Sequence, residues 1–159
     1  MNPWTIDQLI PEVERLQALG KRVVFTNGVF DLIHTGHLRY MLAARSLGDI
    51  LIVGLNSDDS VRRLKGEKRP ILPQIERVKI LGAFDAVDYV IVFEEDTPLN
   101  TIMALRPDIL VKGADYTLNQ IVGKDEVEGW GGQVRTIELV AGVSSSEIIK
   151  RIVQSQKQT

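Results

Sequence analysis

The chain contains no cysteine, which removes several classes of site at once. It can form no disulfide, and it can supply neither a catalytic thiol nor a thiolate ligand for a metal. No apolar run approaches the roughly 20 residues that a membrane-spanning helix needs. The N-terminus also lacks the basic and then apolar order of a signal peptide. We therefore expect a cytoplasmic protein that does not enter a membrane.

The chain also lacks a strong excess of charge of either sign. Its 19 basic and 21 acidic side chains leave a formal net charge of −2, which argues against a general nucleic-acid binder. Hydrophobic residues make up 44% and charged residues 25%, which is typical of a globular protein. The 159 residues fit one ordinary domain. We expect a single domain over 1–159, made of an N-terminal helix (1–20), a core (21–153) and a tail (154–159).

Segments of strand type and helix type alternate along the chain. Apolar runs predict strands at 22–26, 50–55, 89–93, 109–111 and 134–137. Helical spacing and capping residues predict helices at 5–20, 37–47, 57–64, 73–83, 97–105 and 144–154. The run ILIVGL at 50–55 is apolar throughout, as in a parallel strand covered on both faces. The pattern predicts an α/β fold, a single Rossmann-like doubly wound sheet of five mainly parallel strands with helices on both faces.

Polar or glycine-rich residues follow four of these five strands. The sequence TNGVFDLIHTGH follows the first strand and NSDD the second, whereas KGADY follows the fourth and GVSSS the fifth. In doubly wound sheets ligands bind beyond the carboxyl ends of the strands, near the point where the strand order reverses. We therefore expect the ligand site to be built from these segments.

The HTGH turn is the most informative of them. His34 and His37 are the only histidines of the chain, and they lie three residues apart where a loop enters a helix. Gly36 lets an anion approach the backbone, and the helix adds free N–H groups and its positive dipole end. The turn thus predicts a phosphate site whose imidazoles bind more strongly as charge builds up on the phosphate. Two alternatives are packing or capping by the rings, and zinc binding with carboxylates as the remaining ligands.

Two segments carry a resemblance to a known superfamily. FTNGVFDLIHTGHLRYMLAARSLGD resembles the first signature of the cytidylyltransferase-like HxGH nucleotidyltransferases, and GVSSSEIIKRI resembles the second. Within this superfamily the chain is most similar to bacterial D-glycero-β-D-manno-heptose 1-phosphate adenylyltransferases. The blocks that carry this similarity are NSDDSVRRLKGEKRP, VDYVIVFEEDTP, RPDILVKGADY and VGKDEVEGWGGQV, and the likeness runs from about residue 21 to 152.

This resemblance implies a reaction and its participants. AMP would pass from ATP to the heptose 1-phosphate, giving ADP-heptose and pyrophosphate for lipopolysaccharide or surface-glycan synthesis. Mg²⁺ would arrive with ATP, and no nucleic acid or membrane would take part. We also expect a homodimer. Members of the family occur alone or fused to a sugar kinase, and 159 residues have room for the transferase only.

The resemblance also implies roles for individual residues. Catalysis would fall to His34, His37 and Lys65. The nucleotide would contact Thr26, Asn27, Gly28, Val29, Phe30, His34, Gly36, His37, Lys112, Gly113, Asp115, Ser144, Ser145 and Ser146. The sugar phosphate would contact Asp31, Asn56, Lys65 and Arg77. No side chain is expected to serve as a metal ligand.

Several of these residues have a plainer alternative role. Lys65 lies in a basic run, which is usually a solvated loop face, although nearby glycine and proline favour a mobile loop that closes over anions. Ser144 can act only as a helix cap, and Asp115 can simply end a strand. Asp31 can do no more than hold its own turn.

The choice of nucleotide depends on two substitutions. Cytidylyltransferases for polyol phosphates carry an arginine–threonine pair before the glycine of the tail signature, where this chain has Leu139 and Val140. This departure favours ATP over CTP. Val29 stands where the heptose family commonly has cysteine, and Ser145 and Ser146 stand where it commonly has threonine. Two alternatives remain, namely a cytidylyltransferase acting on a polyol phosphate such as glycerol 3-phosphate, and a non-catalytic nucleotide sensor.

Overall fold

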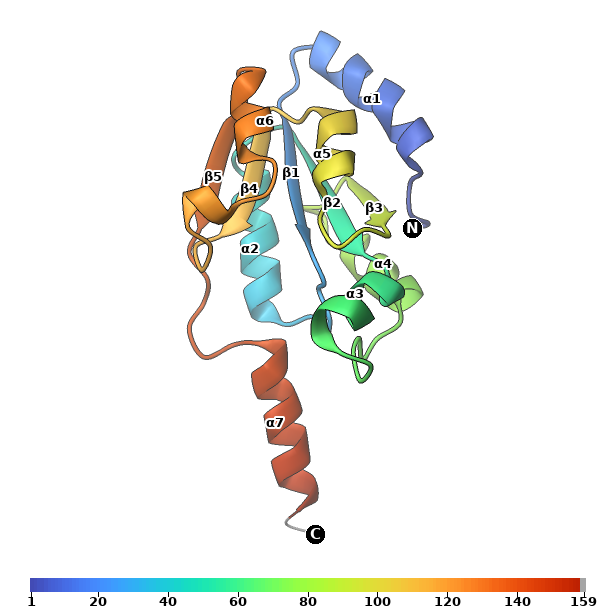
Figure 1. Ribbon diagram of the computed structural model, residues 1–159, viewed down its shortest axis with the longest axis vertical. Coiled ribbons are helices and arrows are strands. Elements are labelled where there is room, and N and C mark those ends of the chain that lie inside the picture. Colours follow the sequence, from blue (N-terminus) through green and yellow to red (C-terminus); the bar gives the residue numbers. More distant parts are fainter. Residues whose placement is uncertain (158–159) are drawn as a thin grey trace.

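The computed structural model describes residues 1–157, and it builds them around one parallel sheet (Figure 1). The five strands lie in the order β3-β2-β1-β4-β5, and every neighbouring pair is parallel. Their bounds are β1 Val23–Gly28, β2 Ile50–Asn56, β3 Tyr89–Phe93, β4 Ile109–Gly113 and β5 Gln133–Ile137. The chain winds outward from β1 to β3 and then returns to the other side of β1, so the order reverses between β1 and β4. The predicted doubly wound α/β fold is confirmed.

Helices cover both faces of the sheet (Figure 1). One face packs against α1 (Ile6–Ala18), α5 (Leu99–Leu105) and α6 (Lys124–Gly129), and the other packs against α2 (Thr35–Arg45) and α4 (Gln74–Leu81). The remaining elements are α3 (Asp58–Lys65), the 3-10 turn η1 (Leu118–Gln120) and α7 (Ser145–Gln156). Figure 1 shows α7 projecting away from the body below the sheet.

The strand sequences explain the two cores. Side chains of a strand alternate between faces, so Val24 of β1 joins the core beneath α2 and α4, while Phe25 joins the core beneath α1 and α5. Both side chains are fully buried. A central strand with helices on both faces therefore needs apolar residues at successive positions, which is the pattern that the sequence shows.

The N-terminal segment is fixed to the edge strand β3. Thr5 caps α1 by accepting a hydrogen bond from the backbone N–H of Gln8, whose side chain accepts one in return. Trp4 packs edge-to-face on Tyr89 at a ring separation of 4.9 Å. The hydroxyl of Tyr89 donates to Glu12 at 2.8 Å, which ties α1 to the strand.

Some boundaries differ from the prediction. β1 and β4 continue to Gly28 and Gly113, two residues beyond the predicted ends. η1 and α6 were not predicted, because the six-residue α6 buries only Val127 and so has no apolar periodicity. The last helix, α7, continues to Gln156, two residues beyond the predicted helix end and into the segment expected as a tail at 154–159. Residues 158–159 of that tail lie outside the described part of the chain.

Candidate active site

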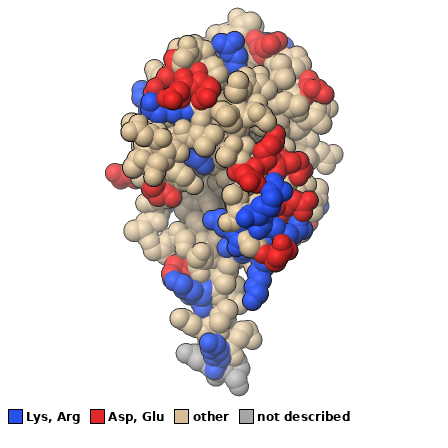
Figure 2. All heavy atoms as spheres, in the orientation of Figure 1, with Lys and Arg blue, Asp and Glu red and all other residues tan. Residues whose placement is uncertain are grey.

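A cleft of about 670 Å³ opens at the carboxyl ends of the strands. This volume lies within the roughly 300–1,000 Å³ that is usual for small-molecule sites. Its walls come from the loop after β1, the first turn of α2, the end of α3, the loops after β3 and β4, and the start of α7. Figure 2 shows the hollow beneath the main body, with Lys and Arg side chains gathered on the α3 side. The cleft therefore lies where doubly wound sheets bind their ligands.

The two histidines lie side by side at the N-terminus of α2. His34 is the N-cap residue, and its Nδ1 accepts a hydrogen bond from the backbone N–H of Gly36 at 3.1 Å. The backbone N–H of His34 in turn donates to Nδ1 of His37 at 3.3 Å. The rings are stacked with their centroids 3.9 Å apart. Because each Nδ1 accepts a hydrogen bond, each neutral ring carries its proton on Nε2.

Burial keeps these rings neutral. It lowers the pKa of His37 from 6.5 to about 4, and the neighbouring His34 contributes to the shift. Burial also lowers the pKa of His34. At neutral pH both side chains thus line the cleft as uncharged N–H donors with a fixed tautomer. Such groups can stabilise growing negative charge on a phosphate without holding a charge of their own.

The HTGH turn leaves little room for a side chain at Gly36, because the His34 ring lies close to it and Val143 lies nearby. A Cβ at this position would lie 2.9 Å from two atoms of the His34 ring, closer than side chains tolerate. The same point lies 3.8 Å from Val143, just before α7. The HTGH turn and the serine turn at 144–146 are therefore neighbours in space.

The serine turn forms the N-terminus of α7. Ser144 is the N-cap residue and accepts a hydrogen bond from the backbone N–H of Glu147 at 3.1 Å, so the predicted cap is confirmed. The hydroxyl of Ser145 donates to the backbone carbonyl of Asp31. All three serines line the cleft. The turn thus presents hydroxyl groups and the positive end of a 12-residue helix to the same space as the histidines.

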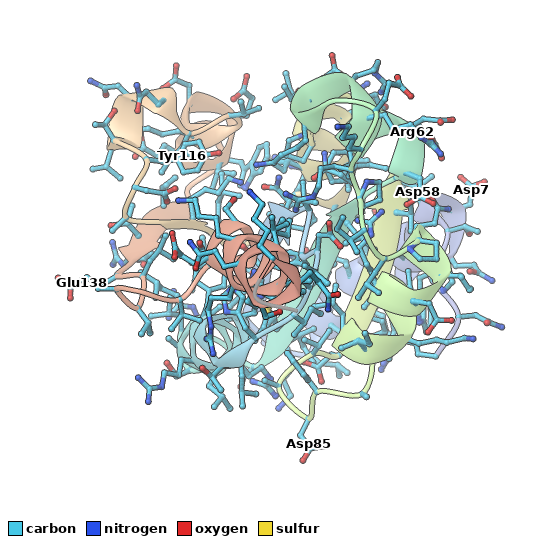
Figure 3. The ribbon with its side chains drawn as sticks, turned by 90° about the horizontal axis from the view of Figure 1, so that it is seen from below. Asp7, Asp58, Arg62, Asp85, Tyr116 and Glu138 are labelled. Carbon is cyan, nitrogen blue, oxygen red and sulfur yellow. The ribbon has the colours of Figure 1, made fainter. Side chains whose placement is uncertain are left out.

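Lys65 lies in the last turn of α3 and lines the same cleft. Its neighbours Arg62 and Arg63 form ion pairs with Asp59 and Asp96, whereas Lys65 has no such partner within residues 1–157. Seen from below along α7, Asp58 and Arg62 lie on the α3 side of the cleft (Figure 3). A cation without a competing partner remains available to a bound anion.

The wall formed by β4 carries a half-buried lysine, Lys112. Nζ of Lys112 donates to the carbonyl of Asn27 at 3.3 Å and lies 4.9 Å from the ring centre of Tyr116. Burial lowers the pKa of Lys112 to about 8, against the opposing effect of Asp115. Oδ1 of Asn27 is also buried and has no hydrogen-bond partner among the described residues. A ligand that donates a hydrogen bond would satisfy it.

Comparison with known proteins identifies the family. The family model described as cytidylyltransferase-like matches residues 25–151, which is most of the chain. The chain belongs to the cytidylyltransferase-like family. The match begins in β1 and includes both the HTGH turn and the serine turn.

Curated relatives narrow the likeness further. The chain is 55% identical over 150 residues to the "Bifunctional protein HldE" of Geobacter sulfurreducens, covering 94% of this chain and 31% of that protein. It is 58% identical over 147 residues to the protein of the same name from Syntrophotalea carbinolica, covering 92% and 30% of the two chains. The chain thus spans about a third of the length of the curated relatives that it matches.

A solved structure shares the fold. The lipopolysaccharide core biosynthesis protein of Thermoplasma volcanium superposes with a TM-score of 0.62 at 29% identity. The match covers 76% of this chain and 98% of the other.

The structure corrects the predicted role of Thr26. We expected it to contact the nucleotide, but its side chain is fully buried on the α2 face of β1. Its hydroxyl bonds to the hydroxyl of Tyr40 at 2.8 Å and donates to the carbonyl of Val111 at 3.0 Å. Thr26 therefore joins β1, β4 and α2 behind the cleft and does not face it.

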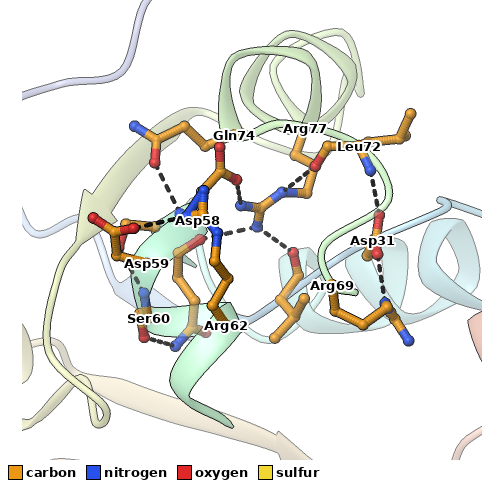
Figure 4. A network of polar contacts seen from close by, with 12 residues as sticks. Asp31, Asp58, Asp59, Ser60, Arg62, Arg69, Leu72, Gln74 and Arg77 are labelled. Carbon is orange, nitrogen blue, oxygen red and sulfur yellow. Dashed lines mark hydrogen bonds and ion pairs between the residues drawn. The ribbon is translucent and has the colours of Figure 1, made fainter. Parts of the chain in front are cut away.

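Arg77 is also not placed as predicted. It was expected to contact the sugar phosphate, but its side chain is fully buried and does not line the cleft. The guanidinium donates to three backbone carbonyls and to Asp58 at 2.7–3.0 Å (Figure 4). Because these donors bond to protein groups, Arg77 has a structural role and joins segments of the protein to one another.

Asp31 also borders the cleft, but its fully buried carboxylate holds the loop at 69–72 and not only its own turn. Burial alone would raise the pKa of Asp31, but hydrogen bonds from that loop bring it below its usual value. Asn56 lines the cleft, and its amide donates to Ser60 at 3.0 Å. The other residues predicted for the site all line the cleft, namely Asn27, Gly28, Val29, Phe30, His34, Gly36, His37, Lys65, Lys112, Gly113, Asp115 and Ser144–Ser146.

Sequence reasoning missed several residues of the cleft, among them Arg69, Asp96, Thr97, Pro98, Gln120 and Val122. Asp96 to Pro98 come after β3, the one strand whose following residues we did not include, and the rule for strand ends would have indicated them. Tyr116 and Val143 also line the cleft, and they lie in the KGADY and GVSSS segments that we expected to build it, although neither was given a role of its own. Gln120 lies on η1, an element without a sequence pattern that we could recognise.

Two further features concern metals and membranes. Within residues 1–157, no three His, Asp or Glu side chains are grouped so that they could hold a metal ion. In the same range, no helix has the length and apolar character that are needed to cross a membrane.

Proposed function

We propose that this chain transfers AMP from ATP to D-glycero-β-D-manno-heptose 1-phosphate, giving ADP-heptose and pyrophosphate. The observation that carries the proposal is the arrangement of two neutral Nε2–H donors beside the serine turn, in one cleft with Lys65. The likeness to heptose 1-phosphate adenylyltransferases favours this substrate. The structural neighbour is a lipopolysaccharide core biosynthesis protein, which supports a role in lipopolysaccharide precursor synthesis.

The reaction needs little chemical machinery from the protein. A sugar 1-phosphate already carries a nucleophilic oxyanion near pH 7, because the second pKa of a phosphate monoester is about 6. This oxygen attacks the α-phosphorus, the bond from that phosphorus to the bridging oxygen breaks, and pyrophosphate leaves. Catalysis then consists of positioning the reactants and stabilising the charge that develops.

The residues divide this task between them. His34 and His37 donate to the α-phosphate and the departing oxygen, and their uncharged state lets these bonds strengthen as charge develops. The serine turn holds the β- and γ-phosphates through hydroxyl and backbone N–H groups. Lys65, which lines the same cleft, bridges the two reacting phosphates.

Mg²⁺ suits this site as a partner of ATP. The described residues hold no group of three or more side chains that could bind a metal, and the carboxylate of Asp31 at the cleft already accepts three hydrogen bonds. Phosphate oxygens and water would hold the ion, which tolerates a largely hydrated shell. When bound, it supplies further charge neutralisation. Because the proposed reaction consumes ATP, we propose that it takes place in the cytoplasm.

We also propose a homodimer. No residue of α7 is buried, and Ile152 and Val153 are about half exposed, at 52% and 48%. Helices of about 12 residues are marginal in water when isolated, so α7 needs a surface to pack against. Sedimentation equilibrium tests this association, and a monomer at all concentrations would contradict it.

The reaction itself is tested by pyrophosphate release. ATP and CTP are each offered with the heptose 1-phosphate and with glycerol 3-phosphate, using the wild type and His34→Ala and His37→Ala variants. We expect turnover with ATP and the heptose phosphate, and a fall in kcat of about 100-fold or more in each variant with ATP affinity little changed. Preference for CTP with glycerol 3-phosphate would establish the cytidylyltransferase alternative. Tight nucleotide binding without turnover for any pair would establish the sensor alternative.

A further inference from the structure

The turn that leads to the histidines has a strained backbone. Phe30 and Leu32 both adopt left-handed conformations, with φ of 48° and 49°, although neither is glycine. Such conformations cost energy and persist only where surrounding contacts hold them. Asp31 lies between the two, and His34 follows two residues after Leu32.

The side chain of Asp31 binds the loop that follows Lys65. Its Oδ2 accepts from Nε of Arg69 at 2.8 Å and from the backbone N–H of Ile71 at 2.7 Å, and its Oδ1 accepts from the backbone N–H of Leu72 at 2.9 Å. The carboxylate is fully buried, so no solvent competes for these bonds. The loop at 66–72 is therefore attached to the strained turn at several points (Figure 4).

Arg77 fixes the same turn and the same loop from beneath. It donates to the carbonyl of Val29 at 2.7 Å and to the carbonyl of Leu72 at 3.0 Å. It also donates to the carbonyl of Asn56 at 2.9 Å, at the end of β2. One rigid, fully buried guanidinium thus joins the end of β2, the start of the strained turn and the end of the loop.

The serine turn is attached to the same residue. The hydroxyl of Ser145 donates to the backbone carbonyl of Asp31. Three separate parts of the cleft thus meet at Asp31. These are the HTGH turn that follows Asp31, the loop at 66–72 that follows Lys65 and is held by the Asp31 side chain, and the serine turn held by the Asp31 backbone carbonyl.

We propose that Asp31 is a positioning residue that sets the distances between the histidines, Lys65 and the serine turn, with Arg77 fixing the backbone on which Asp31 acts. The inference rests on the proposed transferase function, because those three groups are the ones that would hold the reacting phosphates. A displacement of about 1 Å at a reacting centre can cost about 100-fold in rate. Asp31 therefore affects catalysis without touching substrate.

The first experiment replaces the carboxylate by its nearest neutral analogue. Asp31→Asn keeps the size of the side chain, but its amide nitrogen cannot accept a hydrogen bond, so the contacts made by one of the two carboxylate oxygens are lost. Asp125→Asn is the matched control, because Asp125 lies on α6 and its side chain is 94% exposed. We expect kcat to fall by about 100-fold in Asp31→Asn with KM for ATP changed less than about threefold, and no change in the control.

A double-mutant cycle separates positioning from general damage. We expect Lys65→Ala to lower kcat/KM by about 100-fold in the wild-type background but by less than about 10-fold in Asp31→Asn, because Lys65 is already displaced there. Equal losses in both backgrounds would overturn the proposal. Arg69→Gln removes only one of the three partners of the carboxylate, and it supplies the same cycle should Asp31→Asn fail to fold.

Proteolysis gives a readout that does not depend on activity. Lys65 at the end of α3 and Lys68 in the loop at 66–72 are exposed trypsin sites, and cleavage there requires this segment to open locally. Asp31→Asn should accelerate cleavage after these residues more than about tenfold relative to Asp125→Asn, at a temperature where both remain folded by circular dichroism. Unchanged cleavage would refute the attachment itself. If Asp31→Asn is cleaved faster but the wild type turns over no substrate, the proposed function is refuted and the attachment of the loop by Asp31 still holds.

Discussion

The neutral state of His37 predicts an unusual dependence of stability on pH. Burial and the neighbouring His34 lower the pKa of His37 from 6.5 to about 4. The unfolded chain therefore takes up a proton on this ring before the folded chain does. As the pH falls from 6.5 towards 4 the folded state loses stability, and above pH 6.5 this loss is absent.

The magnitude follows from the shift. A fall in pKa from 6.5 to about 4 at about 1.4 kcal/mol per pH unit corresponds to about 3 kcal/mol. The ring is partly exposed, and solvent screening reduces the expected effect to about 2 kcal/mol. His37→Gln has no group that titrates in this range. The free energy of unfolding of the wild type should therefore fall relative to His37→Gln by about 2 kcal/mol between pH 6.5 and pH 4.

Two measurements check this expectation. Urea denaturation followed by circular dichroism at several pH values gives the free energies of both proteins, and proton NMR of the ring Hε1 gives the pKa of each histidine directly. A His37 signal that titrates near 6.5, or a difference between the two proteins that stays constant with pH, would refute the argument from burial. The same result would remove the basis for uncharged donors in the catalytic proposal.

Two further predictions concern packing and nucleotide binding. A Cβ at Gly54 would lie 2.7 Å from the ring of Phe25, so Gly54→Ala should destabilise the protein by about 1–3 kcal/mol. Gly129→Ala, whose Cβ would meet nothing within 4 Å, should not, and thermal unfolding compares the two. Burial lowers the pKa of Lys112 to about 8, so the wild type should bind ATP more weakly as the pH rises above 8, and calorimetry should find no such loss in Lys112→Arg. Parallel pH profiles for these two proteins would show that the charge of Lys112 does not contribute to binding.

The sequence was informative where one local pattern has one physical solution. Successive apolar residues such as Val24 and Phe25 require helices on both faces, and five such strands separated by helices define the doubly wound sheet. The cap at Ser144 was predictable because it depends on the residues of a single turn. The histidine turn was predictable in position for the same reason, since it lies between a strand and a helix.

The roles of the buried polar residues could not be predicted from sequence. Arg77 and Thr26 have residue types that suit a phosphate or a nucleotide, yet both are fully buried. Whether an arginine meets substrate or backbone carbonyls depends on which segments fold over it, and its partners lie up to 48 residues away. The neutrality of the histidines has the same origin, because burial is a property of the packed structure.

By itself the sequence determined which strands form, where their polar ends meet, and that a pair of histidines stands at that edge. It does so because strand burial, helix caps and turns depend on neighbours within a few residues. Only the tertiary structure decided that the histidines are buried enough to stay neutral, that Arg63 pairs with Asp96 while Lys65 has no ion partner in the described chain, and that Asp31 connects three parts of the cleft. These outcomes depend on contacts between segments far apart in the sequence, whose geometry no local pattern encodes.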